Sequence, residues 1–66
     1  MKNNILFFRR KEKISQTELA KRANISRTHL NRIELGVADP SLIVAQKIAH
    51  ALNKNIYDIF FIKDVV

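Results

Sequence analysis

The chain has 66 residues, no cysteine and a formal net charge of +6. Its length predicts one domain over residues 1–66, which would bury only about 60% of its unfolded surface. The lack of cysteine excludes disulfides and thiolate metal sites. No apolar run approaches the roughly 18 residues of a transmembrane helix, and the apolar group at residues 5–8 is too short for a signal peptide, so we expect a cytoplasmic protein.

The positive charge is unevenly distributed along the chain. Residues 1–36 contain nine Lys or Arg and three Asp or Glu, whereas residues 37–66 contain three of each kind. The whole excess therefore lies in the first half. A concentrated positive field favours binding to phosphate groups and fast association with a polyanion.

The first predicted helix contains residues 5–12. Ile5 and Phe8 share the side that we expect to be buried, which leaves Leu6 and Phe7 on another side. These two side chains could cover the C-terminal tail or a partner subunit, or they could simply be exposed. Lys13 follows where the chain must turn.

Residues 16–36 predict two short helices joined by a break. In the first helix Leu19, Ala20 and Ala23 recur at helical spacing, and small alanines permit close helix packing. Asn24 suits the turn because asparagine tolerates a left-handed backbone. Ser26 then has the position of an N-cap for a second helix, preceded by Ile25 in staple position.

The second helix of this segment has two distinct sides. Leu30 and Ile33 define its buried side, and Gly36 closes it as a C′ residue. Facing away from the core are Arg27, Thr28, Asn31, Arg32 and Leu35. Arg and Asn pair bidentately with the major-groove edges of guanine and adenine, and the Thr methyl can contact the thymine methyl. The side therefore has the chemistry of a DNA-reading surface.

The second half predicts packing elements. Asp39 as N-cap and Pro40 at the first helical position would open a helix that Asn53 ends. Asn55 would cap a short last helix at about residues 56–60. The apolar tail that follows predicts a strand over residues 61–64 beside residues 2–4, with a disordered end as the alternative.

We therefore predict an all-α fold, a compact bundle of five helices with a possible two-stranded ribbon formed by the termini. The predicted core comprises Ile5, Phe8, Ile14, Leu19, Ala20, Ala23, Ile25, Leu30, Ile33, Leu42, Ala45, Ile48, Ala49, Leu52, Ile56, Ile59 and Phe60.

The segment SQTELAKRANISRTHLNRIELG, followed by PSLIVAQKIAHALNKNIYDIF, resembles the Cro/CI, or xenobiotic-response-element, family of helix-turn-helix regulators. The resemblance covers residues 3–60. It implies a sequence-specific regulator of transcription, acting as a repressor on double-stranded DNA, with the second motif helix in the major groove. It also implies a homodimer that reads an inverted repeat.

The resemblance assigns roles to individual residues. Groove and base contacts are expected from Arg27, Thr28, Asn31 and Arg32. Phosphate contacts are expected from Ser15, Gln16, Ser26 and His29. Arg9 and Glu34 match an internal ion pair of some relatives. The dimerisation region is expected at about residues 54–66, with contacts from Ile56, Tyr57, Phe60 and Phe61.

Three functions remain open at this point. Besides the DNA-binding regulator, the chain could be an antitoxin-like module that binds another protein, or a cationic membrane-active peptide. The last is disfavoured because the basic residues do not oppose one long apolar face. His29 and His50 lack the partners of a zinc site, and one glycine cannot form a phosphate-binding loop. We therefore predict no enzyme, no metal, no cofactor and no membrane, with an unidentified protein regulator as a possible partner.

Overall fold

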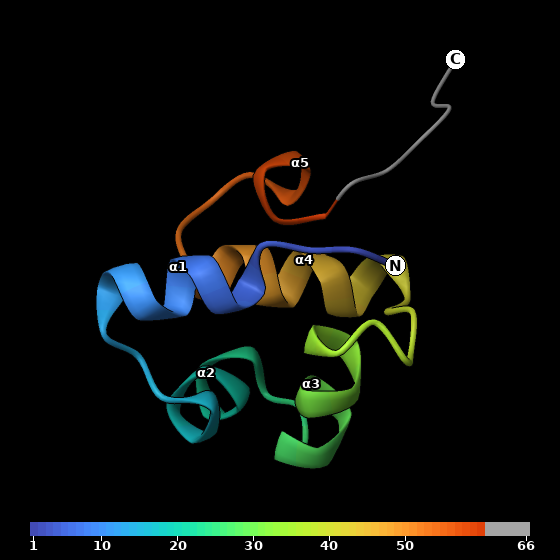
Figure 1. Cartoon of the computed structure of the whole chain (residues 1–66), viewed down its shortest axis with the longest axis horizontal. Helices are drawn as coiled ribbons and strands as arrows, with labels where there is room; N and C mark the ends of the chain where they lie inside the picture. The colour runs from blue at the N-terminus through green and yellow to red at the C-terminus, as the bar shows by residue number, and fades with distance from the viewer. Residues whose placement is uncertain (61–66) are drawn as a thin grey trace.

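The computed structural model describes residues 1–60, which form five helices (Figure 1). These are α1 (Ile5–Glu12), α2 (Gln16–Ala23), α3 (Arg27–Glu34), α4 (Leu42–Ala51) and α5 (Ile56–Ile59). The predicted all-α class is confirmed. Within residues 1–60, β-pairing is limited to one antiparallel bridge between Asn3 and Phe60. The strand predicted over residues 61–64 lies outside the described residues.

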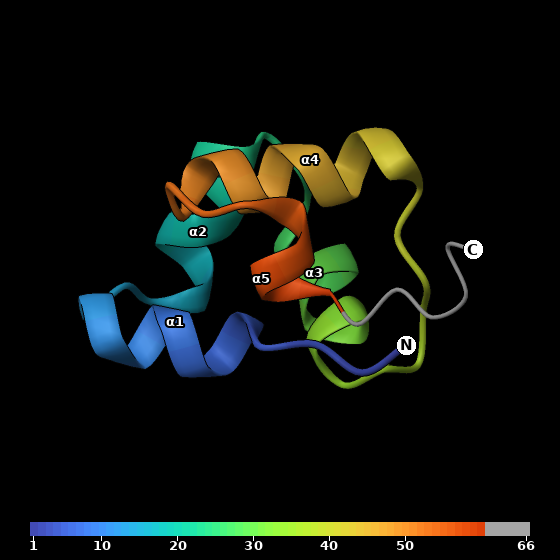
Figure 2. The same ribbon diagram turned by 90° about the horizontal axis from the view of Figure 1, so that it is seen from above.

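The helices form three levels. In Figure 1, α2 and α3 lie side by side on the lower level, with α1 and α4 above them and α5 on top. Viewed from above, α1 and α4 run along opposite sides of the molecule (Figure 2). Contacts join α2 to α3 and to α4, and α4 to α5. The two motif helices, α2 and α3, thus pack against the rest of the chain, which we call the support.

Helix starts follow local chemistry. The Ser15 and Ser26 hydroxyls each accept a hydrogen bond at 3.0 Å from the backbone N–H three residues later, at the starts of α2 and α3. Asn55 forms a reciprocal capping box with Asp58 at the start of α5. Each cap satisfies an amide that the first turn of a helix leaves free. The caps at Ser26 and Asn55 were predicted.

Turns use left-handed backbone. Lys13, Asn24 and Asn53 have φ of 57°, 56° and 57°, and Gly36 has φ of 77°. Asparagine tolerates this conformation well, but for lysine the contact between Cβ and the following carbonyl makes it unfavourable. Lys13 nonetheless adopts the left-handed cap after α1.

The core consists of thirteen side chains in total, and every helix contributes at least one of them. The buried hydrophobic residues are Ile5, Ile14, Leu19, Ala20, Ala23, Leu30, Ile33, Ala45, Ile48, Ala49, Leu52, Ile59 and Phe60. Three further predicted members, Phe8, Ile25 and Ile56, are half-buried and pack against it. Within residues 1–60, no helix has both the length and the apolar character to cross a bilayer.

The prediction for the start of α4 was wrong in two respects. Ser41 caps this helix, because its hydroxyl accepts from the Val44 amide at 3.1 Å, while the Asp39 carboxylate accepts from the Met1 amine at 2.8 Å. Leu42, predicted to be buried, is 65% exposed. The first turn of α4 extends past α2 (Figure 2), and there the core is covered by Val44 and Ala45 rather than by Leu42.

Candidate functional site

The side of α3 that faces away from the core presents a continuous polar surface. Its members Arg27, Thr28, Asn31 and Arg32 are all exposed, and we call these four residues the outer face of α3. At 100° per residue they span a contiguous arc, while Leu30 and Ile33 on the opposite arc are completely buried. Burial of one stripe therefore fixes which side chains point outward.

Gln16, at the first position of α2, joins two members of this face. Its side-chain Nε2 donates to the Asn31 Oδ1 at 3.1 Å, and its Oε1 accepts from the Arg27 Nε at 3.2 Å. With Thr28, these three residues line a surface hollow of about 340 Å³. Arg32 is exposed but does not line the hollow. The sequence predicted each residue here, but not the bridge by which Gln16 orients Arg27 and Asn31.

The other predicted phosphate contacts lie around the helix starts. The Ser15 and Ser26 hydroxyls already accept the capping hydrogen bonds, but a hydroxyl keeps a proton to donate. Both serines are exposed, whereas His29 is half-buried. The N-termini of α2 and α3 thus offer hydroxyl donors together with the positive ends of two helix dipoles.

Arg9 and Glu34 form a bidentate ion pair that ties α1 to the end of α3. The Arg9 Nε lies 2.8 Å from the Glu34 Oε2, and its Nη2 lies 3.0 Å from the Oε1. A third donor, Nη1, reaches the Ile14 carbonyl at 3.1 Å. Both side chains are mostly removed from solvent, with 13% and 8% exposed. The pair therefore constrains how α3 is held on the support.

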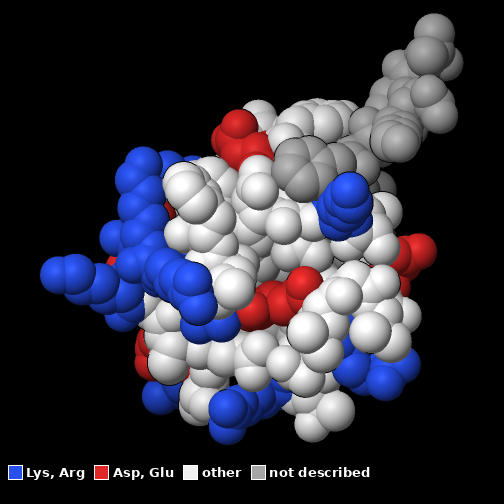
Figure 3. Space-filling model, in the orientation of Figure 1, with Lys and Arg blue, Asp and Glu red and all other residues white. Residues whose placement is uncertain are grey.

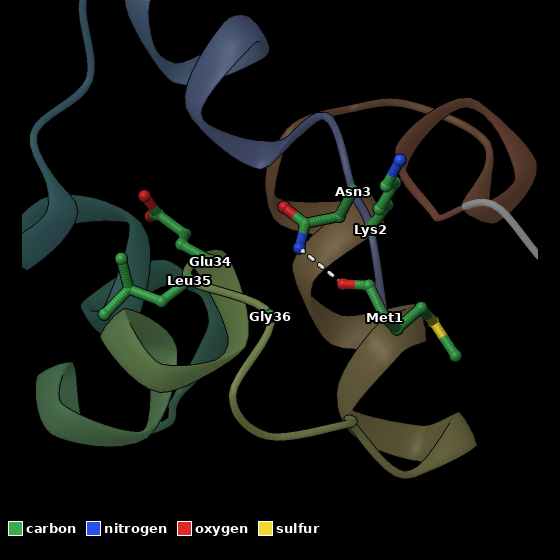
Figure 4. Close-up of a pocket in the computed structure, with 6 residues that line it drawn as sticks. All are labelled: Met1, Lys2, Asn3, Glu34, Leu35 and Gly36. Carbon is green, nitrogen blue, oxygen red and sulfur yellow. Dashed lines mark hydrogen bonds between the residues drawn. The ribbon is translucent and has the colours of Figure 1, made fainter.

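Asn3 makes a second connection to α3, which the sequence did not reveal. Its Nδ2 donates to the Ile33 carbonyl at 2.9 Å and to the Met1 carbonyl at 3.3 Å, while its Oδ1 accepts from the Ile5 amide at 3.1 Å. Figure 4 shows this segment beside the end of α3, across a hollow of about 430 Å³ that Gly36 also lines. One amide side chain thus bonds to backbone groups at the ends of two helices.

Basic side chains gather in several places on the face shown in Figure 3. The densest group lies over the end of α1, a second follows the lower edge, where Figure 1 places α2 and α3, and others lie on the right of the molecule. The second group accompanies the outer face of α3. The positive excess of residues 1–36 is therefore only partly located beside that face.

The expected dimer contacts differ in accessibility. Tyr57 is 62% exposed and Ile56 is half-buried, so both offer surface. Phe60 is 1% exposed and belongs to the core, as predicted, so its side chain offers little surface to a partner. Phe61 lies outside the described residues.

Comparisons with known proteins agree with this geometry. A helix-turn-helix family model matches residues 5–59. An uncharacterised HTH-type transcriptional regulator of Methanocaldococcus jannaschii is 41% identical over 64 residues, covering 97% of both chains. Another, from Archaeoglobus fulgidus, is 43% identical over 60 residues, covering 91% of this chain and 84% of the relative.

Solved structures give the same fold. A hypothetical transcription factor, NHTF, from Neisseria superposes with a TM-score of 0.79 at 31% identity, over 83% of this chain. The clp gene regulator ClgR from Corynebacterium glutamicum gives a TM-score of 0.77 at 26% identity, over 82% of this chain. The chain covers 62% and 57% of those two proteins, respectively.

Proposed function

The chain belongs to the helix-turn-helix family of DNA-binding transcriptional regulators, and we propose that it acts as a homodimeric repressor of an inverted-repeat operator. In this proposal α3 lies in the major groove of each half-site. The observation that carries it is the outer face of α3, four exposed polar side chains opposite a completely buried stripe, two of them held by Gln16.

The side chains of this face would divide the reading between them. Arg27 and Arg32 can each donate two hydrogen bonds to guanine, and Asn31 can pair with adenine. The Thr28 methyl can contact a thymine methyl. Arg27 donates only its Nε to Gln16, which leaves the two terminal nitrogens of its guanidinium for the base.

Gln16 would have two functions at once. Its position at the start of α2, next to the N-cap residue Ser15, suits a phosphate contact. Its bonds to Arg27 and Asn31 would also fix the rotamers of these two side chains before DNA arrives, which lowers the entropy lost on binding. Ser15, Ser26 and His29 would add register contacts to the backbone.

Two copies would pair through α5 and the loop before it, with Ile56 and Tyr57 at the contact. The exposed ring of Tyr57 supports this surface, since aromatic residues dominate protein interfaces. A two-fold axis would place the two copies of α3 about 34 Å apart, one turn of DNA. Bound across a promoter, such a dimer would exclude the polymerase.

The test compares three single variants on an operator selected from random duplexes and on its point variants. Arg32→Ala should relax preference at one position in each half-site, with a loss of about 1–3 kcal/mol of discrimination. Gln16→Ala should lower affinity for every sequence and also relax the positions read by Arg27 and Asn31. Lys47→Ala, which removes an exposed charge from α4, is the matched control and should preserve the preference.

If Arg32→Ala and Gln16→Ala both lowered affinity uniformly across sequences, the assignment of base reading to this face would be wrong. Repression is tested separately, by transcription in vitro from a promoter that carries the selected site. Increased transcription on adding the protein would exclude the repressor role and leave the DNA contacts intact.

A further inference from the structure

We propose that the side of α1 turned away from the core binds an acidic amphipathic helix of a protein partner. This surface comprises Leu6, Phe7, Arg10 and Lys11, and we call it the α1 patch. Leu6 is 42% exposed and Phe7 is 59% exposed, and together with the two basic residues they line a hollow of about 530 Å³.

Folding does not require these apolar side chains. The buried side of α1 is already supplied by Ile5, with Phe8 packed against the core and Arg9 bonded to Glu34. Helical geometry then directs Leu6 and Phe7 to the other side. Single exposed apolar residues are ordinary, but Leu6 and Phe7 are neighbours that line one hollow and so present a joint apolar surface.

Phe7 is held in place rather than free in solvent. Its ring meets the ring of Phe8 edge to face, with centroids 5.0 Å apart and an interplanar angle of 81°. Phe8 in turn packs against the core and carries the Lys54 ammonium 5.2 Å from its ring centroid. An aromatic side chain already fixed in position loses little entropy on binding, which is typical of the anchors of interfaces.

The positive charge of the α1 patch indicates which kind of partner binds there. Neither Arg10 nor Lys11 forms an ion pair within residues 1–60, and both are exposed. A second copy of this patch would bring like charges together, and phosphate would leave Leu6 and Phe7 without an apolar contact. A helix with apolar residues on one side and Glu or Asp beside them can contact both the apolar and the basic side chains of the α1 patch.

The patch also lies apart from the outer face of α3. In Figures 1 and 2, α1 runs along one side of the molecule, above the level of the two motif helices. The basic group over the end of α1 in Figure 3 is separate from the group along the lower edge. A partner on the α1 patch is therefore a different function from DNA reading, and its test is independent of any operator.

The experiment uses the full chain and two synthetic 18-residue peptides. One is an amphipathic helix of Leu, Ala and Glu, and the other has Gln in place of each Glu. Titration of the ¹⁵N-labelled protein with the acidic peptide should give saturable amide shifts centred on residues 6–11. Phe7→Ser and the double variant Arg10→Glu/Lys11→Glu should each weaken binding by about tenfold or more. The Gln peptide should bind more weakly than the acidic one.

The matched controls are Val37→Ser, which removes an equally exposed apolar residue, and Lys47→Glu, which reverses an exposed charge elsewhere. Both should bind the acidic peptide like the unmodified chain. The proposal is overturned if Phe7→Ser binds equally well, or if the shifts lie outside α1. It is also overturned if Phe7 instead governs cosedimentation with vesicles of phosphatidylcholine and phosphatidylserine, or self-association in sedimentation equilibrium without peptide.

Discussion

Removal of either partner of the Arg9–Glu34 ion pair should strongly destabilise the protein. With 13% and 8% of the two side chains exposed, the remaining partner would be a nearly buried charge without its counter-ion, which costs about 3–5 kcal/mol. A chain of 66 residues has a total stability of about 3–10 kcal/mol. Arg9→Met or Glu34→Leu alone should therefore remove a large share of the total stability, and a chain near the lower limit of that range would unfold at 25 °C.

The double variant Arg9→Met/Glu34→Leu should recover most of this loss, because apolar side chains of similar volume need no counter-ion. It should remain about 1–2 kcal/mol below the unmodified chain, since the Ile14 carbonyl still lacks the third Arg9 donor. The two single losses sum to about 6–10 kcal/mol, so the cycle then gives a coupling energy of about 4 kcal/mol or more. Urea unfolding followed by circular dichroism at two protein concentrations separates this from any effect of dimerisation.

The same cycle on Arg22 and Glu18 is the internal control. That pair lies on α2 with 47% and 45% of its side chains exposed, and its coupling should be about 0.5 kcal/mol or less. If the Arg9–Glu34 coupling were as small as this, the pair would not fix α1 against α3, and our account of how α3 is held would be refuted.

Three further predictions concern turns, caps and salt. Lys13→Gly should raise stability by up to about 1 kcal/mol in thermal unfolding, since glycine adopts the left-handed backbone at φ 57° without strain, and a decrease would contradict that reason. Ser41→Ala should lower stability by about 1 kcal/mol and Asp39→Ala by about 0.5 kcal/mol or less, because Ser41 is the cap of α4; the reverse order would restore Asp39 as the cap. A dimer with about 6–10 phosphate contacts should lose roughly three to five decades of operator affinity between 50 and 200 mM salt, and a flat titration would exclude phosphate contacts as the main source of affinity.

Features set by local chemistry could be predicted from the sequence. The starts of α3 and α5 depend on the side chains of Ser26 and Asn55 bonding to the next turn, and the end of α2 depends on the tolerance of Asn24 for a left-handed backbone. The helical spacing of the buried residues Leu30 and Ile33 then determines which side of α3 is exposed. Each of these depends on residues within a few positions along the chain.

Features that depend on contacts between residues far apart in the chain could not be predicted from the sequence. Asp39 and Ser41 are both good cap residues. Ser41 caps α4, whereas Asp39 bonds to Met1, 38 residues away. The bond from the Asn3 side chain to the Ile33 carbonyl also joins residues 30 positions apart. The link from Gln16 to Arg27 and Asn31 likewise needs the angle between α2 and α3, which no local pattern specifies.

The central proposal is that two copies of α3 read an inverted repeat, and selection of bound sites from a pool of random duplexes tests it most directly. The unmodified chain should enrich two half-sites in inverted orientation, with centres about one helical turn apart. Single half-sites or direct repeats would contradict the two-fold pairing. Failure to enrich any motif would contradict sequence reading by the outer face of α3 and favour a protein-binding role.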